Sequence, residues 1–250
     1  MAADSVSLPL VFVNLDRDAE RRQRLEAELA RLHLRGARLH AVWWADVPAA
    51  EQDALYSAEL NRRQYYKPLV NGEKGCYASH IQAWRQLLAS DAPAMVVLED
   101  DVRLDDRLAD GIAAIAALDI PWDMVKLIGR EHEKVRSQRP LLPDVALIEY
   151  QRVPSMTAGY VISRAGAARL LQTRVPFGRP IDVDLRFWWE NQLRILGTLP
   201  ALLVLDETSL ESTIWSERPR VPLLQKLRKF AMKLQLTLGN ARHRRTQRGL

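Results

Sequence analysis

The stretch Ala94-Met-Val-Val-Leu-Glu-Asp-Asp101 decides the fold, because five apolar residues lead directly into three carboxylates. An unbroken apolar run of this length is typical of a strand that is covered on both faces, as in parallel sheets. Ligands of open α/β sheets bind beyond the carboxyl ends of the strands. The stretch therefore predicts a buried central strand with an acidic site at its end.

Apolar runs of strand length and helical patterns alternate on both sides of this stretch. The expected strands are 8–15, 38–43, 94–98, 124–128, 146–150, 158–163 and 202–205, and helices are expected to begin near residues 18, 75, 106, 164 and 182. Residues 129–145 are interpreted as a charged loop, and Asn71-Gly72 as a turn. This alternation predicts an α/β fold with a largely parallel central sheet flanked by helices.

Charge divides the chain into two parts. The net charge is +5, but ten of the 36 Lys and Arg residues lie in residues 218–250, which contain no Asp or Glu. Residues 1–217 therefore have a net charge of −5. We expect a working domain over 1–217 and a basic tail over 218–250. The tail has a single aromatic residue, Phe230, and hence no stacking platform for bases, so nucleic acid is not an expected partner.

The tail has the pattern of an amphipathic helix. One helical stripe of residues 222–238 is apolar: it comprises Leu223, Leu224, Leu227, Phe230, Ala231, Leu234 and Leu238. Lysines lie off this stripe, which favours a helix on an anionic membrane surface. The alternative is a helix that packs on the core.

Composition indicates a folded domain in a reducing compartment. The chain is 48% hydrophobic and 27% charged, and its single cysteine, Cys76, excludes an internal disulfide. The first apolar run is short and is preceded by Asp4 without a basic segment, so no signal peptide is predicted. We expect a cytoplasmic protein on the inner face of the membrane.

The acidic triplet at the strand end predicts a metal site. Adjacent carboxylates repel one another, and a divalent cation removes that repulsion. Mn²⁺ and Mg²⁺ prefer carboxylate and phosphate oxygens, so such an ion would join the protein to a diphosphate. The alternative is a solvated acidic loop that caps the next helix.

The segment Gly72-Glu-Lys-Gly-Cys-Tyr-Ala-Ser-His80, followed by Trp84 and by Val97-Leu-Glu-Asp-Asp-Val102, resembles glycosyltransferase family 25. Further matching segments are 13–17, 20–22, 122–126, 157–164, 180–182 and 200–202, so the resemblance covers residues 8–215. The family comprises lipooligosaccharide galactosyltransferases and collagen galactosyltransferase domains. It implies a GT-A-like nucleotide-diphospho-sugar fold, a UDP-sugar donor, Mn²⁺ or Mg²⁺, and inversion at the anomeric carbon.

The resemblance assigns Asp101 to the metal. Glu99 or Asp100 is expected to contact the ribose or to assist at the metal. The further residues expected at the UDP-sugar are Asn14, Arg17, Arg21, Arg22, His80, Lys126 and Gly159. Five of them have a structural alternative: solvated arginines at Arg21 and Arg22, a buried core histidine at His80, an edge strand at Lys126, and packing at Gly159. For the buried ammonium of Lys126 we expect a partner in the acidic triplet or in a phosphate.

Asp182, in Pro180-Ile-Asp182, is chosen as the catalytic base that takes the proton of the acceptor hydroxyl. The alternative is a helix N-cap, and the rival bases are Asp184, Glu207 and Glu211. Four aromatic side chains are candidates for stacking on sugars, but core packing is the expected use of each: Trp188, Trp189, Tyr65 and Tyr66.

The expected function is transfer of galactose from UDP-galactose to a lipopolysaccharide or lipooligosaccharide core, a lipid-linked acceptor. Alternatives are a metal-dependent nucleotide-sugar hydrolase or nucleotidyltransferase, a non-catalytic binding protein, another donor sugar, and transfer to protein hydroxylysine.

Overall fold

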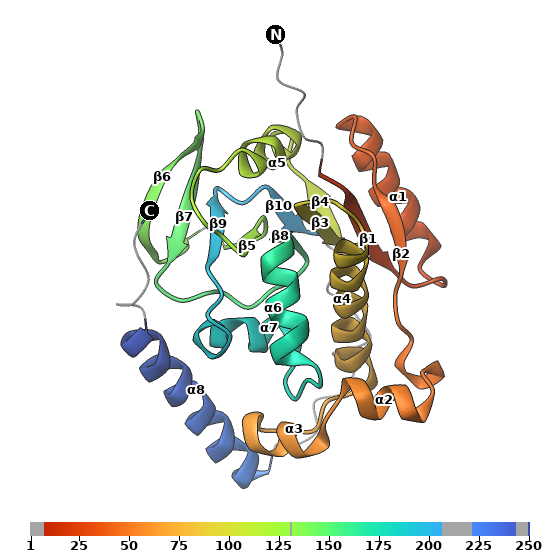
Figure 1. The fold of residues 1–250 in the computed structure, drawn as a ribbon, viewed down its shortest axis with the longest axis vertical. Helices are drawn as coiled ribbons and strands as arrows, with labels where there is room; N and C mark the ends of the chain where they lie inside the picture. The colour runs from red at the N-terminus through yellow and green to blue at the C-terminus, as the bar shows by residue number, and fades with distance from the viewer. Residues whose placement is uncertain (1–7, 131, 207–221, 244–249) are drawn as a thin grey trace.

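The computed structural model describes residues 8–130, 132–206, 222–243 and 250, which form a central sheet between helical layers (Figure 1). The large sheet has eight strands in the order β2-β1-β3-β8-β5-β9-β7-β6, and β4 pairs with β10 in a second sheet. The strands are β1 (Leu10–Asn14), β2 (Ala37–His40), β3 (Ala94–Glu99), β4 (Val102–Leu104), β5 (Met124–Lys126), β6 (Val135–Leu142), β7 (Val145–Tyr150), β8 (Gly159–Ser163), β9 (Ile195–Leu199) and β10 (Leu203–Leu205). The helices are α1 (Ala19–Arg31), η1 (Trp44–Asp46), α2 (Ala49–Leu55), α3 (Ala58–Gln64), α4 (Asn71–Ala89), α5 (Leu108–Ala116), α6 (Arg164–Arg174), α7 (Ile181–Asp184), η2 (Leu185–Glu190) and α8 (Leu223–His243).

Six of the eight strands in the large sheet run in one direction. β1 is parallel to β2 and β3, and β5 is parallel to β9. β8 is antiparallel to β3 and β5, and β7 is antiparallel to β6 and β9. The carboxyl ends of β1, β2, β3, β5 and β9 therefore meet at one edge of the sheet. The predicted α/β class with a mostly parallel central sheet is confirmed.

The central strand β3 is covered on both faces, as its apolar run predicts. Met95 and Val97 pack with α4 and α6 in one apolar cluster, whereas Val96 and Leu98 pack with α1 and α5 in the other. All four side chains are at most 1% exposed. This burial fixes the strand that carries the acidic triplet at its end.

Two strands differ from the sequence-based expectation. β6, with eight residues, lies within the segment 129–145 that was expected to be a loop. It is an edge strand whose residues are half-buried or exposed, and pairing with β7 stabilises it where its own polar sequence gives no strand pattern. β9 was not predicted because Gly197 and Thr198 interrupt its apolar pattern. A side chain at Gly197 would collide with the hydroxyl of Tyr150, so packing requires the glycine.

The expected turn at Asn71-Gly72 is wrong, because both residues belong to the first turn of α4. The Glu73 side chain accepts a hydrogen bond from the backbone N–H of Val70 at 2.9 Å. A carboxylate that reaches back in this way stabilises a helix start. α4 therefore begins earlier than Gly75 and brings residues 70–80 to the carboxyl edge of the sheet.

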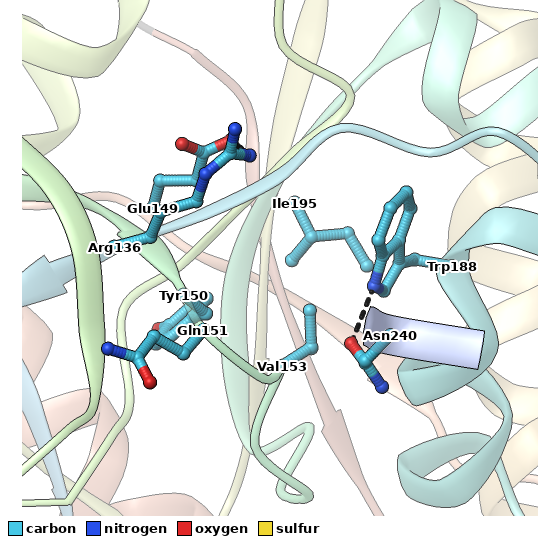
Figure 2. A pocket seen from close by; sticks show the side chains of 8 residues that line it. All are labelled: Arg136, Glu149, Tyr150, Gln151, Val153, Trp188, Ile195 and Asn240. Carbon is cyan, nitrogen blue, oxygen red and sulfur yellow. Dashed lines mark hydrogen bonds and ion pairs between the residues drawn. The ribbon is translucent and has the colours of Figure 1, made fainter. Parts of the chain in front are cut away.

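Helix α8 lies against η2 at the side of the sheet domain (Figures 1 and 2). Figure 2 shows the Trp188 side chain pointing at Asn240 of α8; its Nε1 donates to Oδ1 at 3.1 Å. The expected boundary at residue 217 lies outside the described residues. Within the described part of the chain, every helix is too short or too polar to cross a membrane.

Candidate active site

A cleft of about 1100 Å³ lies at the carboxyl edge of the sheet. Its lining comes from segments 13–24, 41–43, 70–80 and 99–101, which follow β1, β2 and β3 or begin α1 and α4. Pockets for small molecules typically measure about 300–1000 Å³, so a ligand as large as a nucleotide sugar fits. The predicted site residues that line the cleft are Asn14, Arg17, Arg21, His80, Glu99, Asp100 and Asp101.

Asp100 is fixed by side chains from β1 and α1. Its Oδ2 accepts a hydrogen bond from Asn14 Nδ2 at 2.6 Å, and its Oδ1 lies 3.6 Å from Arg21 Nη1. Asn14 Oδ1 in turn accepts from Arg38 Nε at 2.9 Å. Burial raises the pKa of Asp100 and outweighs the lowering by Asn14 and Arg21. Asp100 therefore acts mainly as the group that holds Arg21 at the cleft.

Asp101 has a different environment. Its Oδ1 is buried and has no hydrogen-bond partner among the described residues. Burial and the charges of Glu99 and Asp100 raise the pKa of Asp101 to about 7. Buried polar atoms are normally paired, so this carboxylate suits an external cation. The structure thus agrees with the donor chemistry expected for Mn²⁺ or Mg²⁺ at Asp101 and Glu99.

Glu99 and His80 belong to a buried hydrogen-bond chain. Trp84 Nε1 donates to the Tyr160 hydroxyl at 2.9 Å, and that hydroxyl lies 2.8 Å from His80 Nδ1. His80 Nε2 lies 3.3 Å from Glu99 Oε1, to which Thr157 also donates at 3.2 Å. Burial raises the pKa of Glu99, but hydrogen bonds from His80 and Thr157 make the net direction downward. His80 is only 1% exposed, so its evident role is to orient Glu99.

The indole of Trp43 is a cleft residue that the sequence analysis missed. It is 45% exposed, and the guanidinium of Arg17 lies 4.3 Å from its ring centroid. An exposed tryptophan beside a cation forms a flat platform in the cleft. The available signal was the position of Trp43 as the last residue of the predicted strand 38–43.

Of the two partners expected for Lys126, the acidic triplet accepts no hydrogen bond from it among the described residues, and a phosphate stays a prediction. Lys126 is 1% exposed, as expected for an interior strand, but its Nζ donates to the backbone carbonyls of Pro154, at 2.8 Å, and Met156. Burial lowers the pKa of Lys126 to about 7, although Asp182 favours the charged form. Lys126 therefore holds the loop before β8, and the acidic triplet does not supply its hydrogen-bond acceptors.

Packing accounts for Gly159. A Cβ at this position would lie 2.0 Å from Leu203 Cδ1 and 3.3 Å from Leu98 Cδ2. Gly159 and Lys126 do not line the described cleft, and Arg22 is also absent from its lining. The Arg22 side chain instead lies 3.9 Å from Glu26 Oε1 on the same helix.

The two candidate bases that the structure describes, Asp182 and Asp184, have different surroundings. Asp184 is 3% exposed and accepts from Tyr77 at 2.7 Å and from Arg179 at 3.1 Å, so it is a structural carboxylate. Asp182 lies in the first turn of α7, whose N-cap is Pro180. Burial raises the pKa of Asp182, and its charge acts on Lys126 and Cys76. Glu207 and Glu211 lie outside the described residues.

The aromatic pairs pack rather than line the cleft. Trp188 is buried against α8, and the ring of Trp189 stacks on His243 with a centroid distance of 5.9 Å. Tyr65 and Tyr66 pack on each other, with centroids 4.5 Å apart. Core packing is therefore the use that the structure gives to these side chains.

Cys76 brings a second type of metal ligand to the cleft. One donor atom each from Cys76, His80 and Glu99 lies within 4.8 Å of the others. Burial and the charges of Glu99, Asp182 and Asp101 raise the pKa of the Cys76 thiol. The cleft thus combines hard carboxylate oxygens with a softer sulfur and nitrogen pair.

A mostly parallel α/β sheet with a large cleft at its carboxyl edge is consistent with the GT-A-like fold of nucleotide-sugar-dependent glycosyltransferases. A family model described as Glycosyltransferase family 25 (LPS biosynthesis protein) matches residues 8–185. This match covers most of the chain, and the chain belongs to glycosyltransferase family 25.

Curated relatives agree with this family. Procollagen galactosyltransferase 2 of Homo sapiens is 28% identical over 185 residues, which cover 70% of this chain and 29% of the relative. Procollagen galactosyltransferase 1 of Danio rerio is 28% identical over 189 residues, with coverages of 72% and 31%. The probable inactive glycosyltransferase 25 family member 3 of Bos taurus is 29% identical over 187 residues, with coverages of 70% and 30%. The chain spans about three tenths of the length of these relatives.

Proposed function

We propose that this chain is an inverting, metal-dependent galactosyltransferase that uses UDP-galactose and a lipid-linked oligosaccharide of the lipopolysaccharide type. The observation that carries the proposal is the buried Oδ1 of Asp101, which has no hydrogen-bond partner among the described residues and lies in a cleft of nucleotide-sugar size. Family membership supports the transferase class. The names of the relatives support galactose as the sugar.

The donor is proposed to lie along the carboxyl ends of β1 and β3. Arg21 and Arg17 line this side of the cleft and supply positive charge for a diphosphate. Asn14 and Asp100 hold Arg21 in place, which limits its loss of side-chain entropy on binding. A divalent cation held by Asp101 and Glu99 would supply charge neutralisation at the diphosphate.

Asp182 is proposed to be the general base. Inversion is a single displacement: the acceptor oxygen forms a bond to the anomeric carbon while the bond to the UDP oxygen breaks on the opposite face. The acceptor hydroxyl proton passes to the Asp182 carboxylate. A pKa raised by burial makes this carboxylate a better proton acceptor than an exposed aspartate.

The exposed stripe of α8 supports a membrane-bound acceptor. Leu223, Leu227 and Phe230 are 73%, 59% and 68% exposed. The opposite side of the helix, with Leu236 and Asn240, is buried against the domain. An apolar stripe flanked by lysines fits an anionic lipid surface, as on the cytoplasmic leaflet.

A donor and acceptor screen tests the proposed activity. UDP release is measured with UDP-galactose, UDP-glucose or UDP-N-acetylglucosamine, with Mn²⁺, Mg²⁺ or EDTA, and with lipooligosaccharide, a collagen peptide or no acceptor. We expect release that requires UDP-galactose, metal and lipooligosaccharide. Asp101→Asn removes it, whereas Asp106→Asn, at an exposed position, does not.

Other outcomes of this screen contradict specific parts of the proposal. Metal-dependent release that ignores every acceptor identifies a hydrolase. Release that needs the collagen peptide replaces the lipid-linked acceptor by the type that the names of the relatives suggest. Full activity in EDTA would contradict the proposed metal dependence.

Vesicle co-sedimentation tests the membrane surface. We expect binding to vesicles that contain phosphatidylglycerol, and a loss of at least fivefold in the double variant Leu227→Gln/Phe230→Gln. Val204→Gln removes an apolar side chain that is 58% exposed outside α8 and serves as the control. Equal sedimentation of all three proteins would contradict lipid binding by α8.

A further inference from the structure

Three side chains with different donor atoms converge at the inner wall of the cleft. Cys76 and His80 lie one turn apart on α4, and Glu99 ends β3. Their donor atoms lie within 4.8 Å of one another, and His80 Nε2 is already 3.3 Å from Glu99 Oε1. Ligand atoms around a tetrahedral zinc ion are about 3.3–3.8 Å apart, so small side-chain rotations would bring all three into range.

The hydrogen bonds behind His80 suit a metal ligand. Histidines that bind metal usually donate their other N–H to an oxygen, which fixes the ring. Here the Tyr160 hydroxyl lies 2.8 Å from His80 Nδ1, and Trp84 anchors that hydroxyl by donating to it at 2.9 Å. A cation at Nε2 would replace the hydrogen bond from His80 to Glu99, and the ring would then carry its proton on Nδ1 and donate it to Tyr160.

Charge around the thiol also favours a cation. The carboxylates of Glu73, Glu99, Asp101 and Asp182 all act on Cys76. They disfavour a free thiolate, but a thiolate bound to a divalent cation adds no net negative charge to the cluster. Cysteine and histidine select thiophilic ions rather than Mg²⁺.

We propose that Cys76, His80 and Glu99 form a binding site for a thiophilic divalent cation such as Zn²⁺ or Co²⁺, with a fourth position open to the cleft. Binding forms a metal–sulfur bond and releases the thiol proton to solvent, without any change of oxidation state. The site is distinct in donor set from the carboxylate site of Asp101. Glu99 is common to both, so a thiophilic ion would compete for it.

Cobalt absorption spectroscopy on the full chain tests the site without a sugar nucleotide. We expect one equivalent of Co²⁺ to give a thiolate-to-cobalt charge-transfer band in the near ultraviolet. Cys76→Ser should lose that band, and His80→Gln should weaken Co²⁺ binding at least tenfold. Asp101→Asn should keep the band, because Asp101 is outside this donor set. No band in the wild-type chain, or an equal band in Cys76→Ser, would overturn the proposal.

Protection from alkylation provides a second test with the unaltered chain. Cys76 is the single cysteine, so mass spectrometry reports its reaction with iodoacetamide without ambiguity. We expect Zn²⁺ to slow alkylation at least tenfold, and Mg²⁺ at the same concentration to leave the rate within twofold. Equal rates with and without Zn²⁺ would overturn the site. Neither assay depends on transferase activity, so failure here and failure of the proposed function are separate results.

Discussion

Adjacent residues Asp100 and Asp101 have different environments because their neighbours differ. Asn14 and Arg21 contact the carboxylate of Asp100, whereas Oδ1 of Asp101 has no partner in the described part of the chain. The backbone of Asp101 is held nevertheless, since its carbonyl accepts from Asp206 N at 2.7 Å. A fixed backbone with a buried carboxylate oxygen that has no partner among the described residues supports the proposed role of Asp101 as a ligand-binding residue.

The pKa of Asp101 gives a prediction for the metal-free protein. In the folded state the pKa is about 7, against an ordinary 3.8, because of burial and neighbouring carboxylates. The protonated form therefore stabilises the fold fully below pH 3.8, and this contribution is lost as the pH rises through 7. Asp101→Asn imitates the protonated form. In EDTA, we expect the free energy of unfolding of the variant relative to wild type to rise by roughly 1–3 kcal/mol between pH 5 and pH 8.

Urea unfolding at the two pH values, followed by circular dichroism, checks this prediction. Asp106→Asn, at an exposed carboxylate, is the control and should show no such pH dependence. A variant at Asp101 whose relative stability is the same at both pH values would show that this carboxylate is not strained in the metal-free fold.

Asp182 and Asp184 give a matched pair of variants. We expect Asp182→Asn to lower the rate of transfer at least 100-fold with unchanged UDP affinity, because a general base contributes about that much. Asp184→Asn should instead reduce the free energy of unfolding by about 3 kcal/mol, since it breaks the buried ion pair with Arg179. Transfer kinetics, UDP calorimetry and urea unfolding separate the two. Normal transfer by Asp182→Asn would move the base role to another carboxylate.

The sequence predicted the center of the site better than its surroundings. Residues directly after apolar strands, such as Asn14 and Glu99, could be placed because the carboxyl edge of a sheet is a common ligand position. The carbonyl partners of Lys126 could not be predicted, since they come from a loop about 30 residues away in the chain. Trp43 was missed because no local pattern distinguishes an exposed indole from a buried one.

At the scale of elements, β8 and β10 pack closely at Gly159. Gly159 opens β8, and the Leu203 side chain of β10 lies where a Cβ of residue 159 would be. This contact joins the large sheet to the small β4–β10 sheet next to the acidic triplet. The close packing of β8 on β10 therefore requires a glycine at position 159.

A double-mutant cycle tests the role of Gly159. We expect Gly159→Ala to destabilise the fold by about 1–3 kcal/mol through overpacking. In a Leu203→Ala background the same change should cost at least 1 kcal/mol less, because the colliding side chain has been shortened. Thermal unfolding gives the stabilities, and transfer assays give the activity. Loss of transfer in the double variant, at restored stability, would indicate that Gly159 contacts the donor sugar.

A strand was predicted correctly where its own residues form a complete apolar pattern. Strands that are stabilised mainly by pairing with a neighbour were missed. β3 was predicted from its own residues. β6 is an edge strand rich in polar residues, and it depends on β7. β9 contains Gly197 because of the Tyr150 ring on β7, which is a tertiary cause that a single segment does not show.

At the scale of the whole molecule, α8 joins the domain by one side and exposes the other. Leu236 and Asn240 are 3% and 5% exposed, whereas Leu234 and Leu238 are 48% and 60% exposed. The helix packs on the domain, as one sequence-based alternative predicts, and it also presents an exposed apolar stripe, while binding to a membrane surface stays a proposal. This combination could not be predicted from the amphipathic pattern alone, since the partner surface on η2 is distant in sequence.

Limited proteolysis tests the attachment of α8. We expect Leu236→Asp to speed tryptic cleavage within residues 222–243 at least tenfold, because a buried charge releases the helix from η2. Leu238→Asp, on the exposed stripe, should leave the rate within twofold. Cleavage followed by mass spectrometry measures both. Equal rates for the two variants would mean that the packed face does not hold the helix.

The central claim is that the carboxyl edge of the sheet binds a diphosphate through a cation held by Asp101 and Glu99. A crystal structure with Mn²⁺ and UDP, with anomalous scattering to locate manganese, tests it most directly. The account predicts an anomalous peak in contact with these two carboxylates, and the UDP diphosphate between that ion and Arg21. Manganese and UDP bound elsewhere, with these side chains unliganded, would contradict it.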